Sequence, residues 1–421
     1  MDISTQTVIE KVLARESLYW ENPSACSLAN RGILNDKRTG LKEIIDASNR
    51  LERFKPFIKA VFPETNDGTI ESPLKPAPFF SEKVLKINNS FYIKCDNLLQ
   101  AAGSVKARGG IYEILKHAED LALENNLITT DSDYSIFAEN PMKEFFSKYH
   151  VVVGSTGNLG MSIGIISAKL GFKVSVHMSN DAKEWKKNKL RKLGVNVVEH
   201  KGSYADAVEQ GRISSLEDPY SYFVDDENSM QLFLGYSTAA LRLEKQLNEA
   251  GIKVDRENPL YVYLPCGVGG APGGICFGLK HVFGENVKCY FAEPVNAPSV
   301  LLGFLEGKKI NFRDYGFIMK TDADGLAVDS PSELVLETCR DLTDGFYTVS
   351  DKQMYANLYQ LKEYEYEKIE VSAAASLSGP KITGKGKLKG THIAWLTGGI
   401  FIPDDEYNVM FEKGRIAAGG I

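Results

Sequence analysis

The chain has 421 residues. A single hydrophobic core rarely extends over so long a chain, so the length favours two domains. Its composition, 43% hydrophobic and 25% charged, is that of an ordinary globular protein. A net charge of −6 argues against the basic face that nucleic-acid binding needs, and no apolar run has the length of a membrane span.

The cysteine and histidine patterns favour reduced thiols and argue against a metal centre. No CxxC pair and no HExxH motif occurs, and the start of the chain has no apolar signal core. We therefore expect a cytoplasmic protein without a nucleic-acid or membrane partner. The cysteines are Cys26, Cys95, Cys266, Cys276, Cys289 and Cys339.

The first eighty residues or so are predicted to form helices and loops. Residues 40–62 have apolar side chains at helical spacing, and residues 63–78 form a turn-rich connector. "SFYIKCDN" predicts a strand, and Lys106 in "AAGSVKARGG" then opens a helix. Lys106 is either a solvated lysine at a helix start or an amine placed to react with a ligand.

The middle of the chain is a βαβ unit with parallel strands. "YHVVV" and "FKVSVHM" are predicted strands, separated by the turn "GSTGNLG" and a helix. The pattern returns after residue 258, where the strand "PLYVYLP" leads into "CGVGGAPGG", a helix and the strand "VKCYFAEP". We predict an α/β fold with two parallel sheets, one in each domain.

The loop "CGVGGAPGG" is predicted to hold a phosphate. Its glycines let backbone N–H groups approach an anion at the start of a helix. It is not the GxGxxG fingerprint, because Pro272 stands where a glycine is needed, and no GK[ST] closes it as in a Walker A loop. The alternative is a tight strand-to-helix turn.

Two more loops have polar groups beside glycines. "GSTGNLG" offers Ser155, Thr156 and Asn158 to a carboxylate or phosphate, although a plain turn capped by Asn158 fits as well. Thr397 follows a strand in "THIAWLTGGIFIP", and on local grounds we expect its hydroxyl to bond nearby backbone. A reactive lysine, a phosphate site and a carboxylate site together fit pyridoxal 5′-phosphate and an amino acid.

At this point the motifs "GSVKARGG", "GSTGNLG", "CGVGGAPGG" and "AEP" are similar to those of the fold-type II pyridoxal-phosphate enzymes. The stretches "PETNDGTIES", "DAKEWKKNKLRKLGV", "FVDDENSMQLFLGYS" and "DGLAV" resemble, in order and spacing, the bacterial D-serine dehydratases. The similarity runs from about Trp20 to Gly414. It implies a two-domain fold-type II enzyme, with residues 1–105 and 226–421 in a large domain and residues 106–225 in a small one.

The resemblance also implies the reaction. D-serine would lose water and ammonia to give pyruvate, and D-threonine would be a further substrate. We expect the protein to be a monomer. Lys106 would form the Schiff base with the cofactor and act as a base. Asp226 and Thr156 are the candidates for a proton transfer specific to the D-substrate, and Asp225 is less favoured.

The remaining roles follow from the same resemblance. The backbone of Ser155, Thr156 and Gly157 would hold the substrate carboxylate, and Asn158 would bond the cofactor's phenolic oxygen. Thr397 would face the pyridine nitrogen. The loop residues that would bind the phosphate are Gly267, Val268, Gly269 and Gly270.

Glu293 in "AEP" resembles a position that ligates a monovalent cation, although a surface or salt-bridged glutamate is the alternative. Two positions depart from the family pattern, because Ala271 and Ile400 stand where glycine is usual. If position 271 needs a positive φ, we expect alanine to cost energy there and to alter the phosphate grip slightly.

Three other functions stay open at this point. The first is another fold-type II activity, either an L-serine or threonine dehydratase or a racemase. The second is a nucleotide-binding oxidoreductase, against which the missing GxGxxG spacing counts. The third is a non-catalytic amino-acid sensor that has kept the fold.

Overall fold

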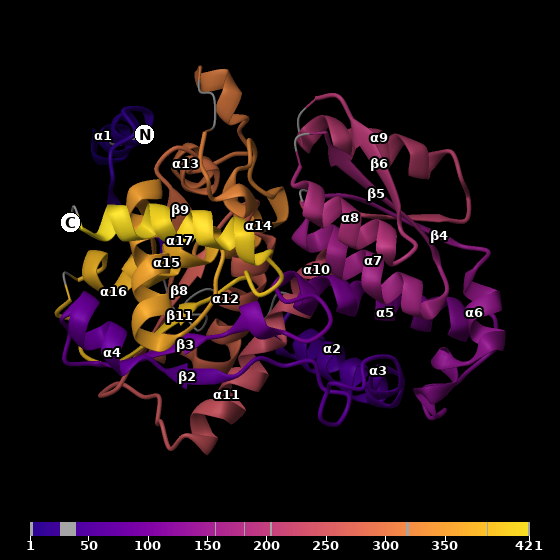
Figure 1. Cartoon of the computed structure of the whole chain (residues 1–421). Coiled ribbons are helices and arrows are strands. Elements are labelled where there is room, and N and C mark those ends of the chain that lie inside the picture. Colours follow the sequence, from indigo (N-terminus) through magenta and orange to yellow (C-terminus); the bar gives the residue numbers. More distant parts are fainter. Residues whose placement is uncertain are drawn as a thin grey trace. The chain divides into compact units, whose positions relative to one another are not determined.

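The computed structural model describes residues 3–25, 39–155, 157–180, 182–202, 204–316, 320–384 and 386–419. The chain forms two compact units (Figure 1). Unit 1 comprises residues 1–41, 72–98 and 239–421, and unit 2 comprises residues 42–71 and 99–238. Within the described part of the chain, no helix combines the length and the apolar character needed to cross a membrane.

Unit 1 contains a seven-stranded sheet in the order β1-β10-β9-β8-β11-β3-β2. The five inner strands are parallel, and the two short edge strands β1 and β2 are antiparallel to their neighbours. The strands are β1 (Tyr19–Glu21), β2 (Leu74–Pro76), β3 (Ser90–Lys94), β8 (Leu260–Pro265), β9 (Val287–Pro294), β10 (Gly345–Val349) and β11 (Thr391–Trp395).

The inner strands β8, β10 and β11 are buried at every residue, as expected for parallel strands covered on both faces. The helices of unit 1 are α1 (Ile3–Leu13), α4 (Pro78–Phe80), α11 (Ala239–Glu249), α12 (Gly270–Phe283), α13 (Ser299–Glu306), α14 (Glu333–Cys339), α15 (Asp351–Glu365), α16 (Gly379–Ile382) and α17 (Asp404–Gly419). A π-helix, η3 (Ser81–Leu85), and a 3₁₀ helix, η9 (Ser372–Ser378), also belong to this unit.

Unit 2 contains a parallel four-stranded sheet in the order β6-β5-β4-β7. Its strands are β4 (His150–Gly154), β5 (Lys173–Ser179), β6 (Asn196–His200) and β7 (Ser221–Val224). Its helices are α2 (Leu41–Arg53), α3 (Lys55–Val61), α5 (Lys106–Glu124), α6 (Asn140–Phe146), α7 (Asn158–Leu170), α8 (Glu184–Lys192), α9 (Tyr204–Leu216) and α10 (Met230–Ser237). The two mainly parallel sheets confirm the predicted α/β fold.

The N-terminal part of the chain differs from a simple run of helices and loops. β1 and β2 each add a three-residue edge strand to the sheet of unit 1. Residues 42–71, which the sequence placed in the large domain, group with unit 2. There Arg53 bonds Glu119, a buried carboxylate that also accepts from Tyr134. The domain boundaries at 105/106 and 225/226 stay a prediction.

Candidate active site

Lys106 is the first residue of α5, and its amine has a carboxylate partner far along the chain. Its Nζ lies 3.0 Å from Oδ1 and 2.9 Å from Oδ2 of Asp226. The side chains of Lys106 and Asp226 are 21% and 9% exposed, so the pair is shielded from most of the solvent. The structure therefore brings together two of the predicted catalytic residues.

Gly109, three positions after Lys106, allows α10 to pack closely against α5. A Cβ on Gly109 would lie 2.5 Å from Cζ of Tyr236, and a Cβ on Gly235 would lie 2.8 Å from the carbonyl oxygen of Arg108. This packing places the Tyr236 ring with its centroid 6.0 Å from Nζ of Lys106. The small residues around Lys106 thus serve the contact between helices, which in turn surrounds the amine.

The loop "GSTGNLG" joins β4 to the start of α7. Ser155 is buried, and its Oγ accepts hydrogen bonds from the backbone N–H groups of Gly157 (3.0 Å) and Gly160 (2.8 Å). Asn158 is half-buried at the first position of α7, and Thr156 lies outside the described residues. The N–H of Gly157, which was predicted to hold a carboxylate, is thus engaged by Ser155 in this structure.

Lys186 is a residue of this region that the sequence reasoning missed. It lies in α8, is only 4% exposed, and its Nζ is 5.6 Å from the ring centroid of Trp185. A Cβ placed on Gly157, whose φ is +147°, would lie 2.3 Å from Cδ and 3.1 Å from Nζ of Lys186. The side chain of Lys186 therefore runs over the loop at Gly157. The sequence offered no local signal for Lys186, because it is one of several lysines in "DAKEWKKNKL", and lysine is rarely buried.

The glycine-rich loop of unit 1 follows β8 and ends at the N-terminus of α12, a helix of 14 residues. A Cβ on Gly267 would lie 2.7 Å from the carbonyl oxygen of Gly325, and Gly269 has φ +111°. The carbonyl of Val268 accepts from the backbone N–H of Ser332 at 2.8 Å. Close approach of backbone at a long helix N-terminus is the arrangement that suits a phosphate.

The two departures from the family's glycine pattern carry no backbone strain. Ala271 lies inside α12, and neither Ala271 nor Ile400 is among the described non-glycine residues with positive φ. Position 271 is helical and does not need a positive φ, so the condition under which alanine would cost energy there is not met.

Thr397 follows β11 at the same edge of the sheet. Its Oγ1 is buried, and among the described residues it has no hydrogen-bond partner, so the expected bond to nearby backbone is not made. The glycines after it pack on Glu370, since a Cβ on Gly398 would lie 2.6 Å from Oε1 and a Cβ on Gly399 only 2.3 Å from the backbone N of Glu370. Sequence reasoning missed Glu370, because "IEVSAAASLSG" contains no local signal for it.

Glu293 is fully buried at the end of β9. Its two carboxylate oxygens accept from the backbone N–H groups of Val300 and Leu301, both at 2.9 Å, in the first turn of α13. Burial raises the pKa of Glu293 to about 8, against the lowering effect of these two N–H donors. Among the described residues, no group of three or more His, Cys, Asp and Glu side chains could share a metal ion.

Each unit by itself has groups that suit pyridoxal 5′-phosphate. In unit 1, the Thr397 hydroxyl has no partner among the described residues and could donate to a pyridine nitrogen, and the close-packed glycines before α12 suit a phosphate. In unit 2, Lys106 supplies an amine for the aldehyde of the cofactor. These are the features of a pyridoxal-phosphate enzyme.

Comparison with known proteins agrees with this class. The family described as "Pyridoxal-phosphate dependent enzyme" matches residues 65–398, and the chain belongs to this family, within the group of the D-serine dehydratases. A probable D-serine dehydratase of Carboxydothermus hydrogenoformans is 53% identical over 407 residues, which cover 95% of this chain and 96% of that protein. Another, from Bacillus cereus, is 48% identical over 429 residues, covering 97% and 96%.

The fold is also that of a solved enzyme. The crystal structure of diaminopropionate ammonia lyase from Escherichia coli in complex with D-serine superposes with a TM-score of 0.75. The two chains are 17% identical, and the alignment covers 96% of this chain and 98% of the other. At this identity the comparison establishes the shared fold-type II architecture.

Proposed function

We propose that this enzyme converts D-serine to pyruvate and ammonia by β-elimination, and that it also accepts D-threonine. The proposal is supported by about 50% identity to probable D-serine dehydratases over nearly the whole chain. The observation that carries the chemistry is the contact of the Lys106 amine with the Asp226 carboxylate.

Each proposed binding role uses a group described above. Pyridoxal phosphate, when bound, withdraws electrons from the α carbon of an amino acid and so makes its proton removable. Lys106 Nζ would attach the cofactor, Asn158 would bond its phenolic oxygen and the backbone from Gly267 to Gly270 would hold its phosphate. The Thr397 hydroxyl would donate to the ring nitrogen. A hydroxyl does not enforce a protonated ring, which suits fast elimination.

The proposed proton transfers centre on Lys106 and Asp226. The Lys106 amine can take up a proton only when it is neutral. While Lys106 is an ammonium paired with Asp226, it can instead give a proton at Nζ to the departing β-hydroxyl. Asp226 and Thr156 remain the candidates for a proton transfer specific to the D-substrate. Because Asp226 contacts Lys106 Nζ, it would act on the same side as that amine.

The substrate carboxylate is proposed to bind at the loop from Ser155 to Gly157. Because Ser155 Oγ already accepts from the N–H of Gly157, the ammonium of Lys186 is the stronger attraction for an anion at this loop. A monovalent cation at Glu293 stays a prediction. The two backbone N–H groups on its oxygens account for its burial without an ion. A monomeric state also stays a prediction, and gel filtration tests it.

The decisive experiment follows the visible absorbance of the purified holoenzyme and the release of pyruvate with D-serine and with L-serine. We expect a band that changes with D-serine, together with pyruvate formation from D-serine and 2-oxobutanoate from D-threonine. Lys106→Ala should lose the band and the activity. Lys116→Ala, on the same helix but paired with Asp120, is the matched control.

Other outcomes would select another function. Pyruvate from L-serine alone would identify an L-serine dehydratase, and interconversion of the enantiomers would identify a racemase. A coloured protein that turns over no amino acid would indicate a non-catalytic sensor.

A further inference from the structure

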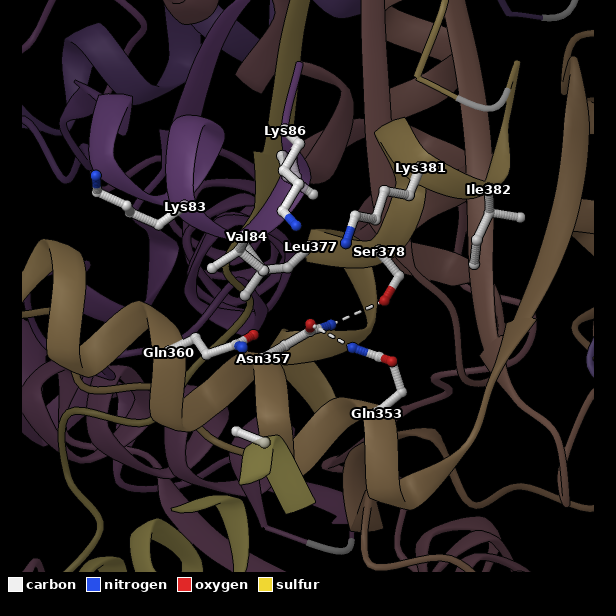
Figure 2. Close-up of a pocket in the computed structure, with 12 residues that line it drawn as sticks. Lys83, Val84, Lys86, Gln353, Asn357, Gln360, Leu377, Ser378, Lys381 and Ile382 are labelled. Carbon is white, nitrogen blue, oxygen red and sulfur yellow. Dashed lines mark hydrogen bonds between the residues drawn. The ribbon is translucent and has the colours of Figure 1, made fainter. Parts of the chain in front are cut away.

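A cavity in unit 1 lies outside the residues of the proposed active site. Its volume is about 290 Å³, and it lies between the end of η3, helix α15 and the segment from η9 into α16 (Figure 2). A cavity of this size, at the lower end of the range for ligand pockets, suits a small molecule.

The lining of the cavity is positively charged. It includes Lys83, Lys86 and Lys381 and contains no aspartate or glutamate. Lys83 pairs with Glu82 at 2.7 Å, whereas among the described residues neither Lys86 nor Lys381 forms an ion pair. Figure 2 shows the amines of Lys86 and Lys381 directed toward one another above Ser378. Lys86 and Lys381 are both exposed residues, and partial desolvation of the Lys381 amine, followed by the charge of Lys86, lowers the pKa of Lys381.

The backbone of Lys86 has a strained conformation. It ends η3 with φ 56° and ψ 45°, in the left-handed region that favours glycine or asparagine. Its backbone N–H donates to the carbonyl of Ser81 at 2.7 Å. A glycine would adopt this conformation with less strain, so the lysine found here agrees with a use for its side chain.

The floor of the cavity is polar and ordered by Asn357, which is only 2% exposed. Its Nδ2 donates to Ser378 Oγ at 2.8 Å and to the carbonyl of Ala374 at 3.1 Å, while its Oδ1 accepts from Gln353 at 2.9 Å. Since Ser378 Oγ accepts from Asn357, its own hydroxyl proton is directed elsewhere and can be donated to a ligand.

We propose that this cavity is an effector site for a small multivalent oxyanion, either a di- or tricarboxylate or phosphate, held between Lys86 and Lys381 with Ser378 as a neutral donor. Two ammonium groups without a carboxylate repel one another, and a bound oxyanion removes that repulsion while accepting charge-assisted hydrogen bonds.

The cavity and the proposed cofactor site share one segment of the chain. Ser378 is the last residue of η9, and Ser372, its first residue, accepts from the backbone N–H of Gly325 at 3.1 Å. Gly325 in turn is the residue against which Gly267 of the phosphate loop packs. An anion that fixes Ser378 therefore acts on a segment that supports this loop, and we expect it to change substrate turnover.

Binding is tested with the holoenzyme, using citrate and inorganic phosphate as separate probes and chloride at matched ionic strength as the reference. Isothermal titration calorimetry compares wild type with Lys86→Gln/Lys381→Gln. The control, Lys308→Gln/Lys389→Gln, removes the same charge at two exposed lysines of unit 1 outside the cavity. We expect the cavity variant to bind one of the probes about tenfold more weakly or worse, and the control to bind it as wild type does.

Retained cofactor absorbance in both variants shows that they are folded. No saturable binding to wild type, or equal weakening in the two variants, would overturn the site. Binding that leaves D-serine turnover unchanged would overturn the effector role. The turnover arm rests on the proposed function, whereas the binding arm does not. A wild-type enzyme that binds citrate but does not convert D-serine would thus refute the proposed D-serine dehydratase activity without contradicting the oxyanion site.

Discussion

The sharpest test of the cofactor site is Thr397→Val, which exchanges one hydroxyl for a methyl group. Oγ1 of Thr397 is buried without a partner among the described residues, and an unsatisfied buried polar group costs about 1–3 kcal/mol. Removing it should leave the free energy of unfolding of the apoenzyme unchanged or raise it by about 1 kcal/mol. Most buried substitutions lower it.

In the holoenzyme the expected sign is opposite. If Thr397 donates to the ring nitrogen, the valine variant loses one hydrogen bond worth about 0.5–1.5 kcal/mol. Cofactor affinity should then fall about two- to tenfold. The combination of a stable apoenzyme and a weaker cofactor complex distinguishes a hydroxyl kept for a ligand from one kept for the fold.

Urea unfolding of the apoenzyme and titration with pyridoxal phosphate, followed by absorbance, measure the two quantities. Thr397→Ser is the matched control, because it keeps the hydroxyl and loses the methyl group, and it should retain cofactor affinity. A valine variant that unfolds more easily by 1 kcal/mol or more and binds cofactor normally would refute the reasoning.

Four further substitutions test other parts of the structure. Asp226→Asn should lower D-serine turnover at least tenfold with little change in cofactor binding, because the amide cannot hold the proton that a carboxylate can; the rate of α-proton exchange in deuterated solvent measures it. Lys186→Met should raise KM for D-serine about ten- to hundredfold and leave the cofactor absorbance unchanged, since a charge-assisted hydrogen bond is worth about 1.5–3 kcal/mol. Ala271→Gly should lower the free energy of unfolding by about 0.5–1 kcal/mol, as glycine does inside helices, without changing cofactor affinity. Burial raises the pKa of Glu113 to about 7, so its carboxyl contributes stability that is full below about pH 4.5 and is lost as pH rises to about 7; Glu113→Gln should reduce the difference in urea midpoint between pH 5 and pH 8.

Each of these has a contrary outcome. Unchanged exchange and turnover in the Asp226 variant would make that residue an ordinary acid and return the proton transfer to Lys106. A KM that also rises in Lys192→Met, an exposed lysine of the same helix, would remove the special role of Lys186. A large loss of cofactor affinity in Ala271→Gly would contradict the argument that this position only forms part of the helix α12. An unaltered pH dependence in Glu113→Gln would contradict the argument from the burial of that carboxyl.

The fold and the loops of the site could be predicted because their signals are local. Apolar strands followed by glycine turns and helices specify a βαβ unit within about thirty residues, and both sheets have the predicted parallel strands. The roles of Gly267 and Gly269 could also be predicted from the sequence. Close approach of the backbone excludes a side chain at position 267, and a positive φ disfavours one at position 269. Lys106 stood out for a related reason, since the small residues that bring α10 against α5 surround it in the sequence.

The partners of these residues could not be predicted from local patterns. Asp226 meets Lys106 across 120 positions, and only the resemblance to a family indicated it. Glu370 packs against Gly398 and Gly399, yet nothing in the sequence around it distinguishes it from a solvated glutamate. Such contacts depend on how the sheet orders its strands, and β8 lies beside β11 although more than a hundred residues separate them.

The pairing of Lys106 with Asp226 has a consequence for the chemistry of the chain itself. Dehydration must take one proton from the α carbon and give one to the leaving hydroxyl, so the protein needs both an acid and a base but no net change in charge. In the proposed reaction, Lys106 and Asp226 would form such a couple, because the nitrogen of one lies 2.9 Å from an oxygen of the other. The side chains of Lys106 and Asp226 are only 21% and 9% exposed, so an unpaired charge on either of them would be costly. We therefore propose that Lys106 and Asp226 act together in these proton transfers.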